Sequence, residues 1–358
     1  SLWRSAPPGV TNETVVAALR GTLERLPEVD DEVRCRTLLA LANELFEQAP
    51  FAEREALVDE ATAMARRLGD PVLVVDACLV GFVALWTVRT AEDRLGRATQ
   101  AMALARETGQ ERELLVAATL RAVVLGELGR PAEMTEAAEL ARAEARRLRI
   151  AFAETVLHGL EVPWLAMRGE FDECERRLEE LRSLARAMTH FDVDESMAAC
   201  LLALRLWQGR SGEAVPMLRQ LDSGLPEFAP TIAVYLWRAG LEAEARDYET
   251  ARGIQIPSDG EVPMHMVAHA AELGLYLGRT DLAAVCHRRL ATYGGMVASI
   301  GASLAIGPVE AYQAMASAAL GETARAGAEA DRALERAREW GLDVFIAWFG
   351  GVRAAYDF

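Results

Sequence analysis

Three stretches of the chain share one pattern: Leu128–Glu133 reads LGRPAE, Arg168–Glu173 reads RGEFDE and Gln208–Glu213 reads QGRSGE. Each contains a glycine that lies forty residues from its counterpart in the next stretch. The glycines are Gly129, Gly169 and Gly209. Glycine is the residue that most often ends an α-helix in the left-handed conformation. The pattern therefore predicts a repeated turn after a helix.

A second kind of turn lies midway between turns of the first kind. Arg67–Pro71 reads RLGDP and Glu107–Glu111 reads ETGQE, and Gly69 and Gly109 are again forty residues apart. Two interleaved turns at an offset of about twenty residues indicate two helices in every repeat of about forty residues.

Continuing this spacing predicts an all-α fold, a tetratricopeptide-like α-solenoid of about eight helix pairs. The predicted pairs span 31–69, 70–109, 110–149, 150–189, 190–223, 224–253, 263–294 and 305–341. Residues 1–30 should hold a leader helix that caps the front of the superhelix formed by 31–341, and 342–358 should begin a further helix. The uncharged run Leu290–Val309 contains several glycines, so we expect a loop feeding a packed helix, not a membrane span.

Composition excludes several classes of function. The net charge is −16 and there is no lysine. A phosphate-binding Walker loop and a Schiff-base enzyme both need lysine, so neither can reside here. The negative charge argues against binding of nucleic acid or an anionic membrane. Five dispersed cysteines without a C-x-x-C pair fit reduced, buried thiols of a cytoplasmic protein. Because the chain opens with Ser1, we expect it to be part of a longer protein.

Alignment of the repeats separates core positions from a candidate binding surface. In the first helices some columns stay apolar, as at Leu120, Leu160 and Cys200, which predicts a buried stripe. A neighbouring stripe is apolar in one repeat and ionic in the next, which predicts the concave surface where helical arrays bind ligands. Its polar members in the third to fifth pairs are Arg121, Glu154, His158, Glu161, Asp194 and Arg205. The alternative is a hydrated groove whose charges pair with each other.

Four tryptophans recur near the ends of first helices: Trp86, Trp164, Trp207 and Trp237. They can pack at the turns of the helix pairs, or Trp207 and Trp237 can form an aromatic rim that contacts a ligand. The sequence leaves both interpretations open.

No arrangement of residues predicts catalysis, a metal site or a cofactor. His265, His269 and Glu272 share one helix face, but Met266 stands where the zinc-protease pattern requires glutamate. We therefore interpret them as partly buried helix residues. His158 with Glu154 and Glu161 is interpreted as an exposed, ion-paired helix face, and no nucleophile with an adjacent base is recognisable.

Three segments resemble the C-terminal helical repeats of actinobacterial-type signalling-ATPase transcriptional regulators, of the LuxR/MalT-like or antibiotic-regulatory kind. The segments are Phe51–Pro71, Leu128–Leu148 and Tyr293–Gly321. The resemblance covers roughly Phe51 to Gly341, although the repeat is nearer forty residues than the thirty-four of ordinary tetratricopeptides. It implies a sensor and autoinhibitory arm that acts on the ATPase and output domains of the same protein. The chain has neither a Walker loop nor a basic helix-turn-helix, so ATP and DNA binding are not carried over.

The leading hypothesis is thus a non-catalytic sensor domain of a transcriptional regulator, which binds a small molecule, protein or peptide in its groove. The alternatives are a free-standing scaffold that binds a partner's peptide or helix, and a helical-repeat enzyme.

Overall fold

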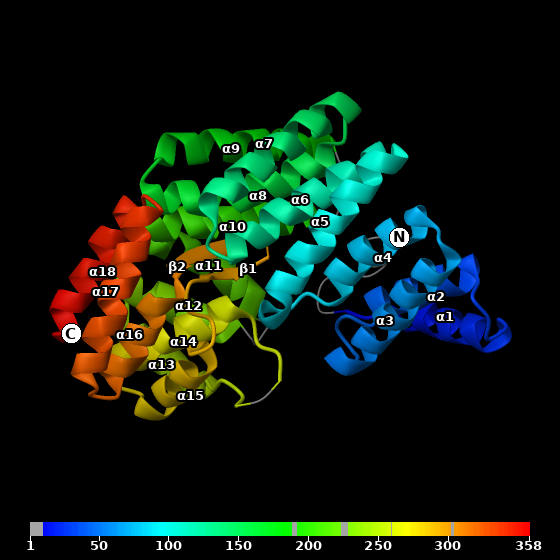
Figure 1. Ribbon diagram of the computed structural model, residues 1–358. Helices are drawn as coiled ribbons and strands as arrows, with labels where there is room; N and C mark the ends of the chain where they lie inside the picture. The colour runs from blue at the N-terminus through cyan, green and yellow to red at the C-terminus, as the bar shows by residue number, and fades with distance from the viewer. Residues whose placement is uncertain (1–9, 188–191, 223–227, 259, 302–303) are drawn as a thin grey trace. The chain divides into compact units, whose positions relative to one another are not determined.

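The structure is a computed structural model that describes residues 10–187, 192–222, 228–258, 260–301 and 304–358 (Figure 1). Over these ranges the chain forms eighteen α-helices, one short 3-10 helix and one two-stranded antiparallel sheet. The prediction of an all-α fold is confirmed. None of the described helices is long and apolar enough to cross a membrane.

The chain divides into two compact units. Unit 1 comprises residues 1–125 and 132–154, and unit 2 comprises 126–131 and 155–358. The first seven helices are α1 (Glu13–Arg25), α2 (Glu32–Glu44), α3 (Phe51–Leu68), α4 (Pro71–Ala84), α5 (Ala91–Thr108), α6 (Glu111–Glu127) and α7 (Pro131–Leu148), with the 3-10 helix η1 (Val88–Thr90) before α5. The last two residues of α6 and the first residue of α7 belong to unit 2, and the rest of these elements lies in unit 1.

Unit 2 contains most of α8 and all the later elements. They are α8 (Ala151–Arg168), α9 (Phe171–Ala187), α10 (Asp192–Trp207), α11 (Ser211–Asp222), α12 (Ala229–Arg238), α13 (Glu242–Arg252), α14 (Met264–Leu277), α15 (Thr280–Leu290), β1 (Val297–Ile300), β2 (Leu304–Pro308), α16 (Val309–Ala319), α17 (Thr323–Glu339) and α18 (Asp343–Tyr356). Each predicted helix-pair range contains two of the observed helices, and α1 and α18 lie in the predicted leader and trailing segments.

The turns form as the glycine spacing predicts. Gly69, Gly109, Gly129, Gly169 and Gly209 all have φ between 67° and 90°, the left-handed conformation that ends a helix. The predicted apolar columns are also buried: Leu120, Leu160 and Cys200 are at most 4% exposed.

The C-terminal helices of unit 2 pack against the helices that come first in its sequence. Trp340, just after α17, packs against Trp164 of α8 with ring centroids 5.5 Å apart. From α18, Phe345 and Trp348 both pack against Trp207 at the end of α10, at 5.7 and 5.5 Å. In a simple solenoid each pair meets only its neighbours. Unit 2 departs from that rule because the predicted eighth pair and α18 contact the fourth and fifth pairs.

A β-hairpin stands where the sequence predicted a loop. β1 and β2 pair antiparallel, with Ser299 opposite Ala305. Every residue of β2 is buried, and the strand packs against α10, α14, α16 and α17 (Figure 1). Tyr312 donates a hydrogen bond to the Ile306 carbonyl at 2.7 Å, which ties β2 to α16. Strand β2 is thus stabilised by burial among four helices, one of which, α10, lies far from it in the sequence.

Candidate ligand-binding site

The predicted polar stripe forms ion pairs with neighbouring helices. Arg121 of α6 lies 3.9 Å from Glu133 of α7, and Glu161 of α8 lies 2.9 Å from Arg177 of α9. Buried His158 places Nε2 3.5 Å from Glu180 of α9. Arg205 of α10 lies 3.0 Å from Glu175 and 3.3 Å from Glu213. These ion pairs join the first helices of the pairs to neighbouring second helices, as expected for a groove whose charges pair with each other.

The two remaining stripe residues are Glu154 and Asp194. Glu154 is half-buried on α8. Asp194 lies on α10, and its side chain is outside the described residues. The ion pairs of Arg121, Glu161 and Arg205 therefore join neighbouring helices, and the binding role of the stripe stays a prediction.

Both tryptophans of the predicted rim contact other aromatic side chains, but only Trp207 is fully buried, whereas Trp237 is half-buried. Trp207 is 4% exposed and lies against Phe345 and Trp348. Trp237 stacks on Tyr276 with centroids 5.1 Å apart and planes inclined by 9°, and the Arg246 guanidinium lies 5.0 Å from its ring centre. Trp237 thus contacts an aromatic ring and a guanidinium group of its own chain, which favours packing at the turns over a rim for ligands.

His265, His269 and Glu272 are all fully buried on α14. His269 Nδ1 lies 2.9 Å from the Thr231 hydroxyl, and Glu272 accepts two hydrogen bonds from Arg238 at 2.6 and 2.8 Å. Neither ring nitrogen of His265 has a hydrogen-bond partner among the described residues. Burial lowers the pKa of His265 to about 3, so its ring is neutral at physiological pH. In the part of the chain that the structure describes, no three His, Cys, Asp or Glu side chains are grouped to hold a metal.

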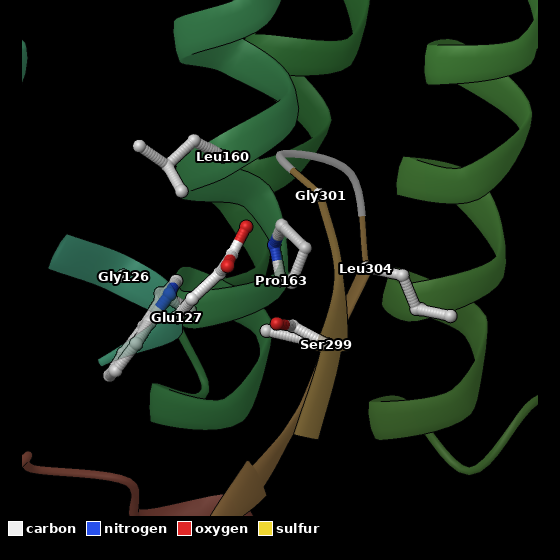
Figure 2. Close-up of a pocket in the computed structure, with 9 residues that line it drawn as sticks. Gly126, Glu127, Leu160, Pro163, Ser299, Gly301 and Leu304 are labelled. Carbon is white, nitrogen blue, oxygen red and sulfur yellow. The ribbon is translucent and has the colours of Figure 1, made fainter. Parts of the chain in front are cut away.

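A small hollow with a cavity volume of about 10 Å³, room for about one water molecule, lies in unit 2 between the hairpin and helix α8 (Figure 2). Its lining comes from the end of α6, from α8 and from the hairpin: Gly126, Glu127, Leu160, Pro163, Trp164, Ser299, Gly301, Leu304 and Ala305. Figure 2 shows the Glu127 carboxylate projecting between Leu160 and Pro163. The hollow thus has apolar walls, one carboxylate and one hydroxyl.

Glu127 is the unexpected member of this lining. It is the last residue of α6 and only 6% exposed. The residues at the same repeat position in the second, fourth and fifth pairs are Thr87, Met167 and Trp207, and all three are buried and uncharged. Our sequence analysis did not select Glu127. The signal that would have identified it is a charged residue at a repeat position that is uncharged in the other pairs.

The α8 wall of the hollow depends on a proline inside the helix. Pro163 has no N–H, so the Gly159 carbonyl one turn earlier loses its usual helical donor. The Cys200 thiol of α10 points to that carbonyl at 3.9 Å, and the Cys174 thiol of α9 to the Val162 carbonyl at 3.5 Å. Helices on either side thus support α8 next to the hollow.

No protein-family model matches the chain, and neither does any curated protein.

Proposed function

We propose that this chain is a non-catalytic binding domain that senses a ligand or partner on behalf of a larger regulatory protein. The paired helices, whose turns follow the glycine register, support a tetratricopeptide-like superhelix of about eight pairs. Such arrays serve as extended binding surfaces. The resemblance to the repeats of signalling-ATPase regulators suggests that the attached ATPase and output domains are what the domain controls.

The observation that carries the proposal is the regular succession of helix pairs. Each of the eight predicted ranges contains two helices, and Gly69, Gly109, Gly129, Gly169 and Gly209 all adopt the left-handed conformation at the turns. Stacked helix pairs offer an extended surface to a ligand or partner.

A thermal-shift screen of the purified chain tests the proposal. The compounds should include amines, carboxylates, sugars and short peptides. We expect at least one class to raise the melting temperature, because a ligand that binds only the folded state stabilises it by mass action. Failure of every class to shift the wild-type protein would overturn the proposal.

A further inference from the structure

We propose that the C-terminal ends of α8, α10, α12 and α14 form a binding surface for an amphipathic helix of a partner protein. Helix α18 occupies this surface in the free protein, and a partner helix with a matching aromatic face displaces it. This inference rests on the proposed binding function and specifies the partner.

Helix α18 crosses these four helix ends in the order of the chain. The contacts are Val344 at Gly169 just after α8, Trp348 on Trp207 of α10, Trp348 on Arg238 of α12, and Tyr356 on Tyr276 of α14. The four crossed helices are the first helices of the fourth to seventh pairs. The repeat therefore presents a row of equivalent helix ends to one crossing helix.

One face of α18 makes these contacts. Phe345, Phe349 and Val352 are buried, whereas Ala347 and Ala354 are exposed. The buried residues are three or four positions apart, a spacing that places them on a single stripe of the helix. Amphipathic helices of separate proteins bind to apolar grooves with the same spacing of anchor residues.

Arg238 makes the surface selective for an aromatic anchor. Its guanidinium donates two hydrogen bonds to Glu272 and lies 3.8 Å from the ring centre of Trp348. The side chains of Arg238 and Glu272 are at most 8% exposed. A cation fixed in this way attracts the ring electrons of an indole. A partner helix should therefore carry tryptophan at the position of Trp348 and an aromatic residue three positions earlier, as Phe345 does here.

The ion pair between α18 and α17 adds little to the attachment of α18. Arg353 lies 2.6 Å from Asp331 of α17, but the Asp331 side chain is 71% exposed. Exposed ion pairs contribute little to stability. The attachment of α18 thus depends on apolar and aromatic contacts, which a partner helix of the same pattern can replace.

Fluorescence anisotropy with a labelled peptide of residues 341–358 tests the proposal on the full chain. In the wild type α18 competes with the peptide at a high effective concentration, so binding should be weak. Trp348→Leu in the protein weakens α18 and leaves the surface itself unchanged. We expect this variant to bind the peptide at least tenfold more tightly than the wild type does. Ala347→Ser, on the exposed face of α18, is the matched control and should bind as weakly as the wild type.

A second peptide tests the aromatic anchor. A peptide that itself carries Trp348→Leu should bind the variant protein at least tenfold more weakly than the unaltered peptide, because it cannot cover Arg238. Equal binding of the two peptides, or no gain in affinity in the variant protein, would overturn the proposal.

Amide hydrogen exchange shows whether α18 leaves the surface. In the wild type we expect α18 to exchange at least a hundredfold faster than α14, because α18 opens without the rest of unit 2. In the Trp348→Leu variant, an excess of peptide should remove the remaining protection of α18 and leave that of α17 unchanged. Exchange of α18 and α14 at one rate, or a bound peptide that leaves α18 protected, would contradict displacement.

Two other outcomes are distinguishable. Dimers of Trp348→Leu that form in place of peptide binding would assign the surface to a second copy of the chain and overturn the partner assignment. If the thermal-shift screen finds a ligand while the peptide does not bind, the helix-binding surface fails and the proposed function stands.

Discussion

At the scale of single residues, Arg149 shows how the repeat constrains the backbone. It stands forty residues after Gly109, and its φ of 57° is left-handed like the 70° of Gly109. A residue with a Cβ pays about 1–2 kcal/mol for this conformation. Since the Arg149 side chain is exposed, we expect Arg149→Gly to raise the free energy of unfolding by about 1 kcal/mol in urea denaturation. Arg146→Gly, three residues earlier within α7, should lower it by a similar amount.

His265 predicts a dependence of stability on pH. Its pKa is lowered from 6.5 to about 3 by burial, and burial also places the pKa of His269 well below 6.5. Below pH 6.5 the unfolded chain binds protons that the folded chain does not, so stability is complete above pH 6.5 and is lost as the pH falls toward 3. The loss is up to about 1.4 kcal/mol per pH unit for each histidine.

Replacing this histidine should reduce the effect. We expect His265→Leu to gain about 2 kcal/mol relative to wild type on going from pH 7 to pH 5, because one of the two buried rings no longer titrates. Urea denaturation at both pH values measures the difference. Identical pH profiles for the two proteins would show that His265 becomes protonated without unfolding.

At the scale of elements, two turn glycines with the same conformation should differ in tolerance. Gly129 and Gly209 have φ of 68° and 69°. A Cβ on Gly129 would lie 2.4 Å from the Gly295 carbonyl oxygen and 2.5 Å from the Trp340 ring, whereas a Cβ on Gly209 meets nothing within 4 Å. Gly209→Ala should therefore cost only about 1 kcal/mol of backbone strain. Gly129→Ala should lower the free energy of unfolding, measured by thermal or urea denaturation, by about 3 kcal/mol or more. Backbone strain and steric overlap add in this variant. Equal costs would mean that the loop after α6 moves away freely.

The elements also show what the sequence could predict. Helix ends followed from glycine spacing because a left-handed turn is a local property of the chain. The hairpin did not follow, since strand β2 is buried against helices that include the distant α10, a contact that no local pattern encodes. The burial of Trp207 depends on Phe345 and Trp348, which no repeat pattern relates to it. The alignment of repeats that identified the core also shows Glu127 as a charged residue in an uncharged column. The predicted site, however, was taken from the neighbouring stripe of varied residues.

At the scale of the whole molecule, the two ends of the chain should differ in importance. Helix α18 buries Phe345, Phe349 and Val352, while among its described residues α1 buries only Val16. Burial of one large apolar side chain contributes about 1.5–3 kcal/mol. Deleting residues 343–358 should therefore cost at least about 5 kcal/mol and yield aggregated protein, whereas deleting 1–26 should leave a soluble, helical protein by circular dichroism. Similar losses of stability from both deletions would contradict this prediction. They are expected of an array in which each helix pair contacts only its neighbours.

The return of α18 to α10 also has a consequence for the order of synthesis. Trp207 leaves the ribosome long before Phe345 and Trp348, the residues that cover it. At usual rates of translation the interval is on the order of 10 s. During this time helix α10 has been synthesised, but its apolar surface at Trp207 is still exposed to solvent. A nascent chain paused between the two segments should therefore recruit chaperones that bind apolar surfaces, and release them once α18 has emerged.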